Sequence, residues 1–380
     1  MSIPSQTRAD RLTEAALVDS IRRLVECESP SADDGAIARS ADLVAQIGTE
    51  LLGAEPERIV VDGCTHLRWN FGVKTRVVLL AHHDTVWPAG TIERLPFGVR
   101  DGVLRGPGSF DMKAGLAMAL HALASLEDRD GVTLLVTGDE EIGSARSRDL
   151  IESTARGADA VLVLEASADG GALKAARKGA AMYDVVIEGR AAHAGLEPHD
   201  GVNATVALAH LALAVVALAD EDAGTTVTPT VASSGATGNT VPAAASLHID
   251  ARAWSAAELE RVDESLRAYR SPVDGARIVF GGGINRPPLE RGMSAGLLVI
   301  AGDTAAGLGL GAVAAVEVGG GSDGNFTAAL GVPTLDGLGA VGGGAHADDE
   351  HVLVAELLPR TRLLIELIGR TMRTDGPWHG

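Results

Sequence analysis

Three short apolar runs constrain the fold of this chain most strongly. Each run ends in, or is followed directly by, polar residues of the kinds found in catalytic and metal sites. The runs are 76–82 (RVVLLAH), 132–138 (VTLLVTG) and 160–165 (AVLVLE), and an apolar helical pattern at 114–126 separates the first two. Buried strands that alternate with helices predict a mostly parallel sheet flanked by helices. Such sheets bind ligands where their strands end, so these polar residues become candidate site residues.

The pattern changes after Gly179. Residues 181–188 and 247–252 alternate apolar and polar side chains, as strands with one buried face do, and 202–219 predicts an apolar helix. The first pattern returns after residue 288. Because 380 residues exceed one compact core in most folds, we predict a larger α/β domain with a mixed, mostly parallel sheet and a smaller inserted α+β domain. The larger domain is expected to comprise 1–177 and 288–380, and the smaller one 178–287.

Composition excludes several classes of protein. The chain has 32 basic and 51 acidic residues, a net charge of −19, which argues against binding nucleic acid. No apolar run reaches the ~18 residues of a membrane span, and the charged N-terminal segment lacks the apolar part of a signal peptide. The two cysteines, Cys27 and Cys64, form no CxxC motif. We therefore predict a cytoplasmic location and no membrane partner.

Polar residues follow two of the apolar runs directly. His82 and Asp84 are two apart and share one face of a strand. A histidine beside a carboxylate fits a metal ligand and the group that orients it, although a polar strand end has the same pattern. Asp139, Glu140 and Glu141 are consecutive after the second run. Three adjacent carboxylates repel one another, so they indicate either bound cations or an exposed acidic turn.

Three further residues are weak signals alone. Asp111 opens an apolar helix, where an Asp is also a common N-cap. Glu165 ends the third run, and His346 follows a glycine-rich segment. With His82 and Glu141, they form a set of histidine and carboxylate groups suited to zinc that keeps an open position for water. Two Zn²⁺ ions would balance the four negative charges of Asp111, Glu140, Glu141 and Glu165.

A serine hydrolase is the main rival interpretation. Residues 320–324 (GGSDG) match G-x-S-x-G between a strand predicted at 312–318 and a helix, the context of a nucleophile elbow. Asp336 and His346 follow Ser322 in the order that such a triad would need. This interpretation leaves the acidic residues after the apolar runs unexplained.

In this order, the motifs resemble the dizinc metallopeptidase family of aminoacylases, glutamate carboxypeptidases and succinyl-diaminopimelate desuccinylases. The resemblance extends from about Leu24 to Ile368 and is closest to the glutamate carboxypeptidase branch at 139–151 (DEEIGSARSRDLI). It implies two Zn²⁺ ions per subunit, with Co²⁺ or Mn²⁺ as substitutes. It also implies a cis peptide bond between Asp111 and Met112.

The resemblance assigns a role to each candidate. His82 and Glu165 would bind one zinc, Glu141 and His346 the other, and Asp111 would bridge both. Asp84 would orient His82, and Glu140 would be the general base that takes a proton from the bridging water.

The inserted segment resembles the dimerisation domain of this family, which implies a homodimer formed through 178–287. Within it, His193 (in AHAG) matches a residue that stabilises the oxyanion, often across the dimer. Asn239 (in GNTVP) and Arg252 (in IDAR) match positions that contact the substrate in the carboxypeptidase branch. A guanidinium suits a carboxylate because it binds in a bidentate manner.

The expected activity is metal-dependent hydrolysis of a peptide or N-acyl amide bond that releases a C-terminal amino acid from a small-molecule substrate. An N-acyl-amino-acid amidohydrolase and a dipeptidase with the same mechanism remain alternatives, as does a non-catalytic relative that keeps the fold. Arg177 and Lys178 stand where the closest glutamate-releasing enzymes are expected to carry small polar residues, which leaves side-chain specificity open.

Overall fold

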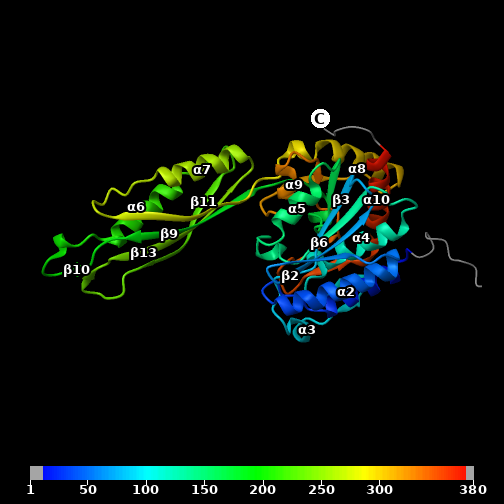
Figure 1. Cartoon of the computed structure of the whole chain (residues 1–380), viewed down its shortest axis with the longest axis horizontal. Coiled ribbons are helices and arrows are strands. Elements are labelled where there is room, and N and C mark those ends of the chain that lie inside the picture. Colours follow the sequence, from blue (N-terminus) through cyan, green and yellow to red (C-terminus); the bar gives the residue numbers. More distant parts are fainter. Residues whose placement is uncertain (1–11, 374–380) are drawn as a thin grey trace, which may run out of the picture. The chain divides into compact units, whose positions relative to one another are not determined.

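A computed structural model describes residues 12–373, which divide into two compact units (Figure 1). Within these described residues, unit 1 comprises 12–176 together with 290–318 and 322–373, and unit 2 comprises 177–289 with 319–321. We describe each unit by itself.

Unit 1 is built on a six-stranded sheet with the order β1-β2-β6-β3-β7-β16. Neighbouring strands from β6 to β16 run parallel, whereas β1 and β2 are antiparallel to their neighbours. The predicted mixed, mostly parallel sheet is therefore confirmed. Its strands are β1 (Glu57–Val61), β2 (Cys64–Phe71), β3 (Val77–His82), β6 (Val132–Thr137), β7 (Ala160–Val163) and β16 (Thr334–Leu335).

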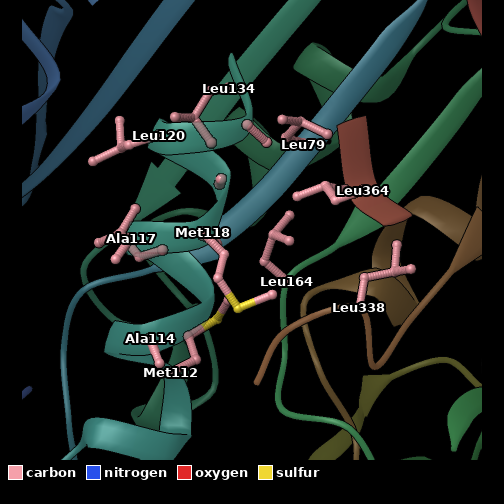
Figure 2. Close-up of a cluster of buried hydrophobic side chains, with 14 of the residues drawn as sticks. Leu79, Met112, Ala114, Ala117, Met118, Leu120, Leu134, Leu164, Leu338 and Leu364 are labelled. Atoms are coloured by element: carbon pink, nitrogen blue, oxygen red, sulfur yellow. The ribbon is translucent and has the colours of Figure 1, made fainter. Parts of the chain in front are cut away.

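The central strand β3 shows why its residues do not alternate between apolar and polar. Leu79 packs into the core on one face of the sheet, and Leu80 packs into a separate core on the other. Because both faces are covered, every residue of β3 is buried. Figure 2 shows the first core, in which Leu79 and Leu134 from the sheet lie near Met118 and Leu120 of the apolar helix α4. The helices with residues in this core are α1 (Glu14–Glu26), α2 (Asp34–Leu52), α4 (Ala114–Ser125), α8 (Ala295–Gly307) and α10 (Val354–Arg373), and those with residues in the second core are α5 (Arg148–Ala155) and α9 (Gly324–Ala329).

Because β3, β6 and β7 are parallel, their carboxyl ends lie at one edge of the sheet. One expectation was wrong here. The strand predicted at 312–318 begins at Ala315 and pairs with β8 in a separate two-stranded sheet, instead of joining the large sheet. Its side chains are largely exposed, so it lacks the burial that a central strand of the large sheet would have. The remaining elements of unit 1 are α3 (Thr91–Arg94), β4 (Gly98–Arg100), β5 (Val103–Arg105), β8 (Leu173–Arg177), β15 (Ala315–Val318), β17 (Gly342–Gly343) and β18 (His351–Leu353).

Unit 2 is a four-stranded antiparallel sheet with the order β11-β13-β9-β14 and two helices packed into one core with it. Strand β9 alternates buried and exposed residues, as predicted for a strand with one covered face. Ser255 is the N-cap of α7, because its hydroxyl accepts a hydrogen bond from the Glu258 N–H. The elements are β9 (Gly179–Glu188), β10 (Ala192–His193), α6 (Ala204–Val216), β11 (Thr226–Ser234), β12 (Thr240–Val241), β13 (Ala244–Ala253), α7 (Ala256–Ala268) and β14 (Arg277–Arg286). Among the described residues of the whole chain, no helix is both long and apolar enough to span a membrane.

Candidate metal centre

His82 is the last residue of β3 and is 2% exposed. Its Nε2 lies 3.5 Å from Asp111 Oδ1 and 3.4 Å from Glu165 Oε1, and it has no hydrogen-bond partner. Its other ring nitrogen, Nδ1, lies 3.1 Å from the main-chain oxygen of Asp84. A proton on Nδ1 serves that bond, so Nε2 is the ring nitrogen that faces the two carboxylates.

His346 lies beside the other oxygen of the Asp111 carboxylate. Its Nε2 lies 3.2 Å from Asp111 Oδ2 and 3.2 Å from Glu141 Oε2. The backbone of His346 has a φ of +61°, a left-handed conformation that a residue other than glycine rarely adopts. The two oxygens of Asp111 therefore face two different histidines, and each histidine has a second carboxylate beside it.

These separations fit metal coordination better than direct hydrogen bonds. Two ligands that are each about 2.0–2.1 Å from a tetrahedral zinc lie about 3.3 Å apart. The four N–O distances around His82 and His346 are 3.2–3.5 Å. His82, Asp111 and Glu141 form one group of ligand atoms that all lie within 4.8 Å of one another, and His82, Glu140 and Glu165 form another. The residues present therefore fit two adjacent metal ions with Asp111 between them.

The electrostatics of the cluster favour cations. Asp111 and then Glu141 raise the pKa of His346 to about 10. Burial lowers the pKa of His82, but Asp111, Asp84 and Glu165 outweigh it and hold that pKa well above its ordinary value. The carboxylates thus stabilise positive charge at both imidazoles, and metal ions bound there would supply it in place of protons.

Asp84 connects the His82 strand to the acidic turn after β6. Its two carboxylate oxygens accept the N–H groups of Glu140 at 3.2 Å and Glu141 at 3.1 Å, and Ser31 Oγ donates to it at 2.7 Å. Its carboxylate also lies 3.4 Å from His82 Nδ1. Asp84 is fully buried, so it holds both neighbouring segments in a fixed arrangement.

Glu350 is a positioning residue that sequence reasoning missed. Its buried carboxylate accepts the N–H groups of Gly108, Phe110 and Asp111 and the indole N–H of Trp87, at 2.8–3.0 Å. These bonds fix the loop that presents Asp111, whose peptide bond to Met112 is cis, as the resemblance predicted. A single acid in a loop gives no sequence signal for this role.

The serine-hydrolase alternative is wrong. Ser322 is fully buried, and its hydroxyl donates directly to Asp336 Oδ2 at 2.5 Å, without an imidazole between them. His346 faces Asp111 and Glu141 instead. The G-x-S-x-G match therefore marks a packed polar pair.

Two of the remaining candidates lie together in unit 2. His193 is on β10, which pairs with β12, and Asn239 is the residue directly before β12. The Asn239 carbonyl accepts the Ala194 N–H at 2.9 Å. His193 Nδ1 accepts the N–H groups of Gly195 and Leu196, both at 3.1 Å. The neutral ring therefore carries its proton on Nε2, which makes this exposed histidine a hydrogen-bond donor.

Arg252 lies on β13 and forms a bidentate ion pair with Asp250, with a shortest distance of 2.9 Å. Arg177 and Lys178, which leave side-chain specificity open, have partners within unit 2. Arg177 donates to the carbonyls of Gly320 and Gly321 at 3.0 and 3.1 Å, and Lys178 lies over the Trp254 ring at 5.2 Å.

The α/β unit carries paired histidine–carboxylate groups of the kind that metal-dependent enzymes use. Residues 78–370 match the model of peptidase family M20/M25/M40. The chain therefore belongs to this family and is one of its peptidases or amidohydrolases.

Known relatives agree with this assignment. The chain is 30% identical over 377 residues to carboxypeptidase G2 of Pseudomonas sp. (strain RS-16), covering 93% of this chain and 90% of that protein. It is also 30% identical to the succinyl-diaminopimelate desuccinylase of Burkholderia cenocepacia (strain HI2424), covering 81% and 88%.

Solved structures share the fold. Aminopeptidase PepT from Bacillus cereus ATCC 10987 superimposes with a TM-score of 0.74 at 21% identity, covering 95% of this chain and all of that one. An M20 family metallo-carboxypeptidase from Sulfolobus solfataricus does so with a TM-score of 0.73 at 18% identity, covering 93% and 98%.

Proposed function

We propose that the chain is a dizinc hydrolase that releases a C-terminal amino acid from a small peptide or an N-acyl amino acid. The observation that carries the proposal is the position of Asp111, whose two oxygens lie 3.5 and 3.2 Å from two different histidines. In this proposal His82 and Glu165 would hold one zinc, His346 and Glu141 would hold the other, and Asp111 would contribute one oxygen to each. The similarity to carboxypeptidase G2 supports the choice of a carboxypeptidase substrate.

The metals would polarise the scissile carbonyl and make water acidic enough to attack near neutral pH. Glu140 then takes the proton of the attacking water and returns it to the leaving amine. Its place beside His82 and Glu165, within one group of ligand atoms, supports this role. Asp84 keeps Glu140 in place through the main-chain N–H of that residue.

His193, Asn239 and Arg252 complete the proposal. The Nε2–H of His193 would stabilise the oxyanion, because charge that develops in the transition state is stabilised by a preorganised donor. Arg252 and Asn239 would bind the carboxylate of the substrate. Asp250 holds the Arg252 guanidinium in one orientation while leaving further N–H donors of the fork for a ligand.

Metal removal tests the class of mechanism. The purified enzyme is treated with a chelator, assayed, and assayed again after Zn²⁺ or Co²⁺ is added. The substrates are dipeptides, N-acyl amino acids and N-succinyl amines, and release of the C-terminal amino acid is measured. We expect loss and recovery of activity, with the best turnover on substrates that carry a free C-terminal carboxylate. Activity that survives complete metal removal would contradict the proposal.

Glu140→Ala tests the general base. We expect the variant to keep the same metal content as the natural chain and to lose about 10²–10⁴-fold in kcat. Glu152→Ala, which removes a carboxylate paired with Arg148 on the surface of α5, is the matched control. A Glu140→Ala enzyme that keeps more than about a tenth of the control's kcat would remove Glu140 from this role.

A homodimer formed through the inserted segment is also part of the proposal. Strand β11 is an edge strand of the unit 2 sheet. Its Val231 is 66% exposed, and Leu213 on α6 is 73% exposed. Exposed apolar side chains at a free sheet edge are typical of a surface that pairs with another chain. Light scattering should give a dimer mass for the natural chain and a monomer mass for Val231→Lys. Val279→Lys on the opposite edge strand β14 is the control and should remain dimeric.

Loss of the dimer also tests whether His193 acts across it. If it does, the Val231→Lys monomer loses activity together with its partner, while its metal content stays unchanged. We keep a cytoplasmic location in the proposal because Cys27 and Cys64 are both free thiols, which suits a reducing compartment. Cell fractionation with an antibody to the chain tests it.

A further inference from the structure

A second group of metal-ligating side chains lies in unit 1. Cys64, His66 and Asp139 each offer one ligand atom, these atoms all lie within 4.8 Å of one another, and all three residues are buried. Cys64 and His66 are two apart at the start of β2 and share one face of the strand. Leu67 pairs with Val136 in the antiparallel β2–β6 ladder, so three residues further along the same register Asp139 comes opposite Cys64.

Two of these residues carry buried polar atoms without a hydrogen-bond partner. His66 Nε2 and Asp139 Oδ1 are both in this state, and both side chains are fully buried. Buried polar groups are almost always paired, so two unpaired atoms in one cluster require an explanation. His82 Nε2 and Glu141 Oε1 in the dinuclear cluster show the same feature. Both clusters thus combine closely spaced ligand-type side chains with buried polar atoms that have no hydrogen-bond partner.

Main-chain N–H groups hold the carboxylate of Asp139 through one oxygen. Its Oδ2 accepts the N–H groups of Arg146 and Ser147 at 2.8 and 3.3 Å, which leaves the buried Oδ1 as the oxygen without a partner. The charge nearby is compatible with a cation. The Arg146 guanidinium lies beside the Cys64 thiol, but it also pairs with Asp34 at 2.5 Å. Burial and then the Asp139 carboxylate raise the pKa of Cys64 to about 12, so the thiol keeps its proton until a metal ion displaces it.

We propose that Cys64, His66 and Asp139 bind a further divalent metal ion, separate from the dinuclear centre. Mixed thiolate, imidazole and carboxylate ligands suit zinc. Binding breaks the Cys64 S–H bond, forms a metal–sulfur bond and releases the thiol proton to solvent.

Nδ1 of His66 accepts the Gly138 N–H at 3.2 Å, so the neutral ring carries its proton on Nε2. Coordination through Nε2 requires that this proton move to Nδ1, and the Gly138 N–H then loses His66 as its acceptor. The ion ties the start of β2 to the turn that begins at Asp139 and presents Glu140 and Glu141. Its role is structural, because all three ligands are buried.

Cobalt substitution tests the proposal, because the ligands assigned to the dinuclear centre contain no sulfur. The natural chain is loaded with Co²⁺ and, separately, with Zn²⁺, then dialysed. We expect about three metal ions per chain and a thiolate-to-cobalt charge-transfer absorption band. Cys64→Ser should lose that band and one metal ion, and circular dichroism confirms that it folds. Cys27→Ser, which changes the second free cysteine, is the matched control and should keep both.

His346→Ala separates the two centres. It should lose metal from the dinuclear centre and activity, but keep the sulfur-to-cobalt band. Should Cys64→Ser fail to fold, X-ray absorption on the zinc-loaded natural chain decides, since one sulfur at about 2.3 Å from zinc is then expected. A natural chain with about two metal ions, no band and no sulfur neighbour would overturn the proposal. That result would leave the dizinc proposal intact and would indicate a buried water between His66 and Asp139.

Discussion

Replacing Glu350 by Gln should weaken the metal centre although Glu350 itself is not among the proposed ligands. The carboxylate accepts four N–H bonds, two at each oxygen. In the variant, one oxygen becomes an NH₂ group, which donates and cannot accept. Two of the four donors then face another donor in a buried site. The loop that presents Asp111 loses its fixed position as a result.

The magnitude follows from these bonds. A buried donor without an acceptor costs about 1–3 kcal/mol, so two cost about 2–6 kcal/mol. If about 3 kcal/mol of this cost falls on the metal-bound arrangement, the Kd for metal rises roughly a hundredfold. The remainder lowers the free energy of unfolding.

Metal titration with a competing chelator measures the Kd, and urea unfolding of the metal-free chain measures stability. Asp348→Asn is the control, since Asp348 is two residues away, exposed, and paired only with Arg94 at the surface among the described contacts; exposed pairs contribute ~0–1 kcal/mol. A Glu350→Gln chain with the metal affinity and stability of that control would refute the reasoning.

Two further predictions concern stability. Burial lowers the pKa of His121 to about 4 in the folded chain. As the pH falls, the unfolded chain therefore takes up this proton before the folded chain does. The free energy of unfolding is unaffected by this group above about pH 6.5 and falls by up to ~3 kcal/mol toward pH 4. Urea unfolding across that range should show a smaller acid loss for His121→Gln, and equal slopes would contradict the assignment. In Gly115→Ala the new Cβ would lie 2.0 Å from the Leu164 carbonyl oxygen, so we expect a loss of at least ~1–3 kcal/mol. In Gly302→Ala, in α8, the new Cβ meets nothing within 4 Å, so this variant should be neutral or stabilising. An equal loss of thermal stability in both variants would contradict this explanation.

The sequence alone predicted the sheet and its functional edge. Apolar runs such as Val77–His82 are recognisable because a strand covered on both faces must be apolar throughout. Parallel strands end at one edge, so the sequence predicts that His82, Glu141 and Glu165 lie near one another. His82 and Glu165 do lie together, and Asp111 links them to His346 and Glu141.

Local pattern also misled. Ser322 has the neighbours of a nucleophile elbow, but its exposure and its partner depend on which residues pack around it, and these come from distant parts of the chain. Glu350 and Asp111 are 239 residues apart. No spacing rule connects them, because a loop carboxylate finds its donors only when the chain folds.

The sequence by itself determined the kind of chemistry, since residue types and strand ends restrict which side chains can meet metal ions. Tertiary structure alone decided which oxygen of Asp111 faces which histidine, how Glu350 holds that loop, and that Cys64 and His66 meet Asp139. The physical reason is that these arrangements depend on hydrogen bonds and strand register, which pair residues without regard to their separation along the chain.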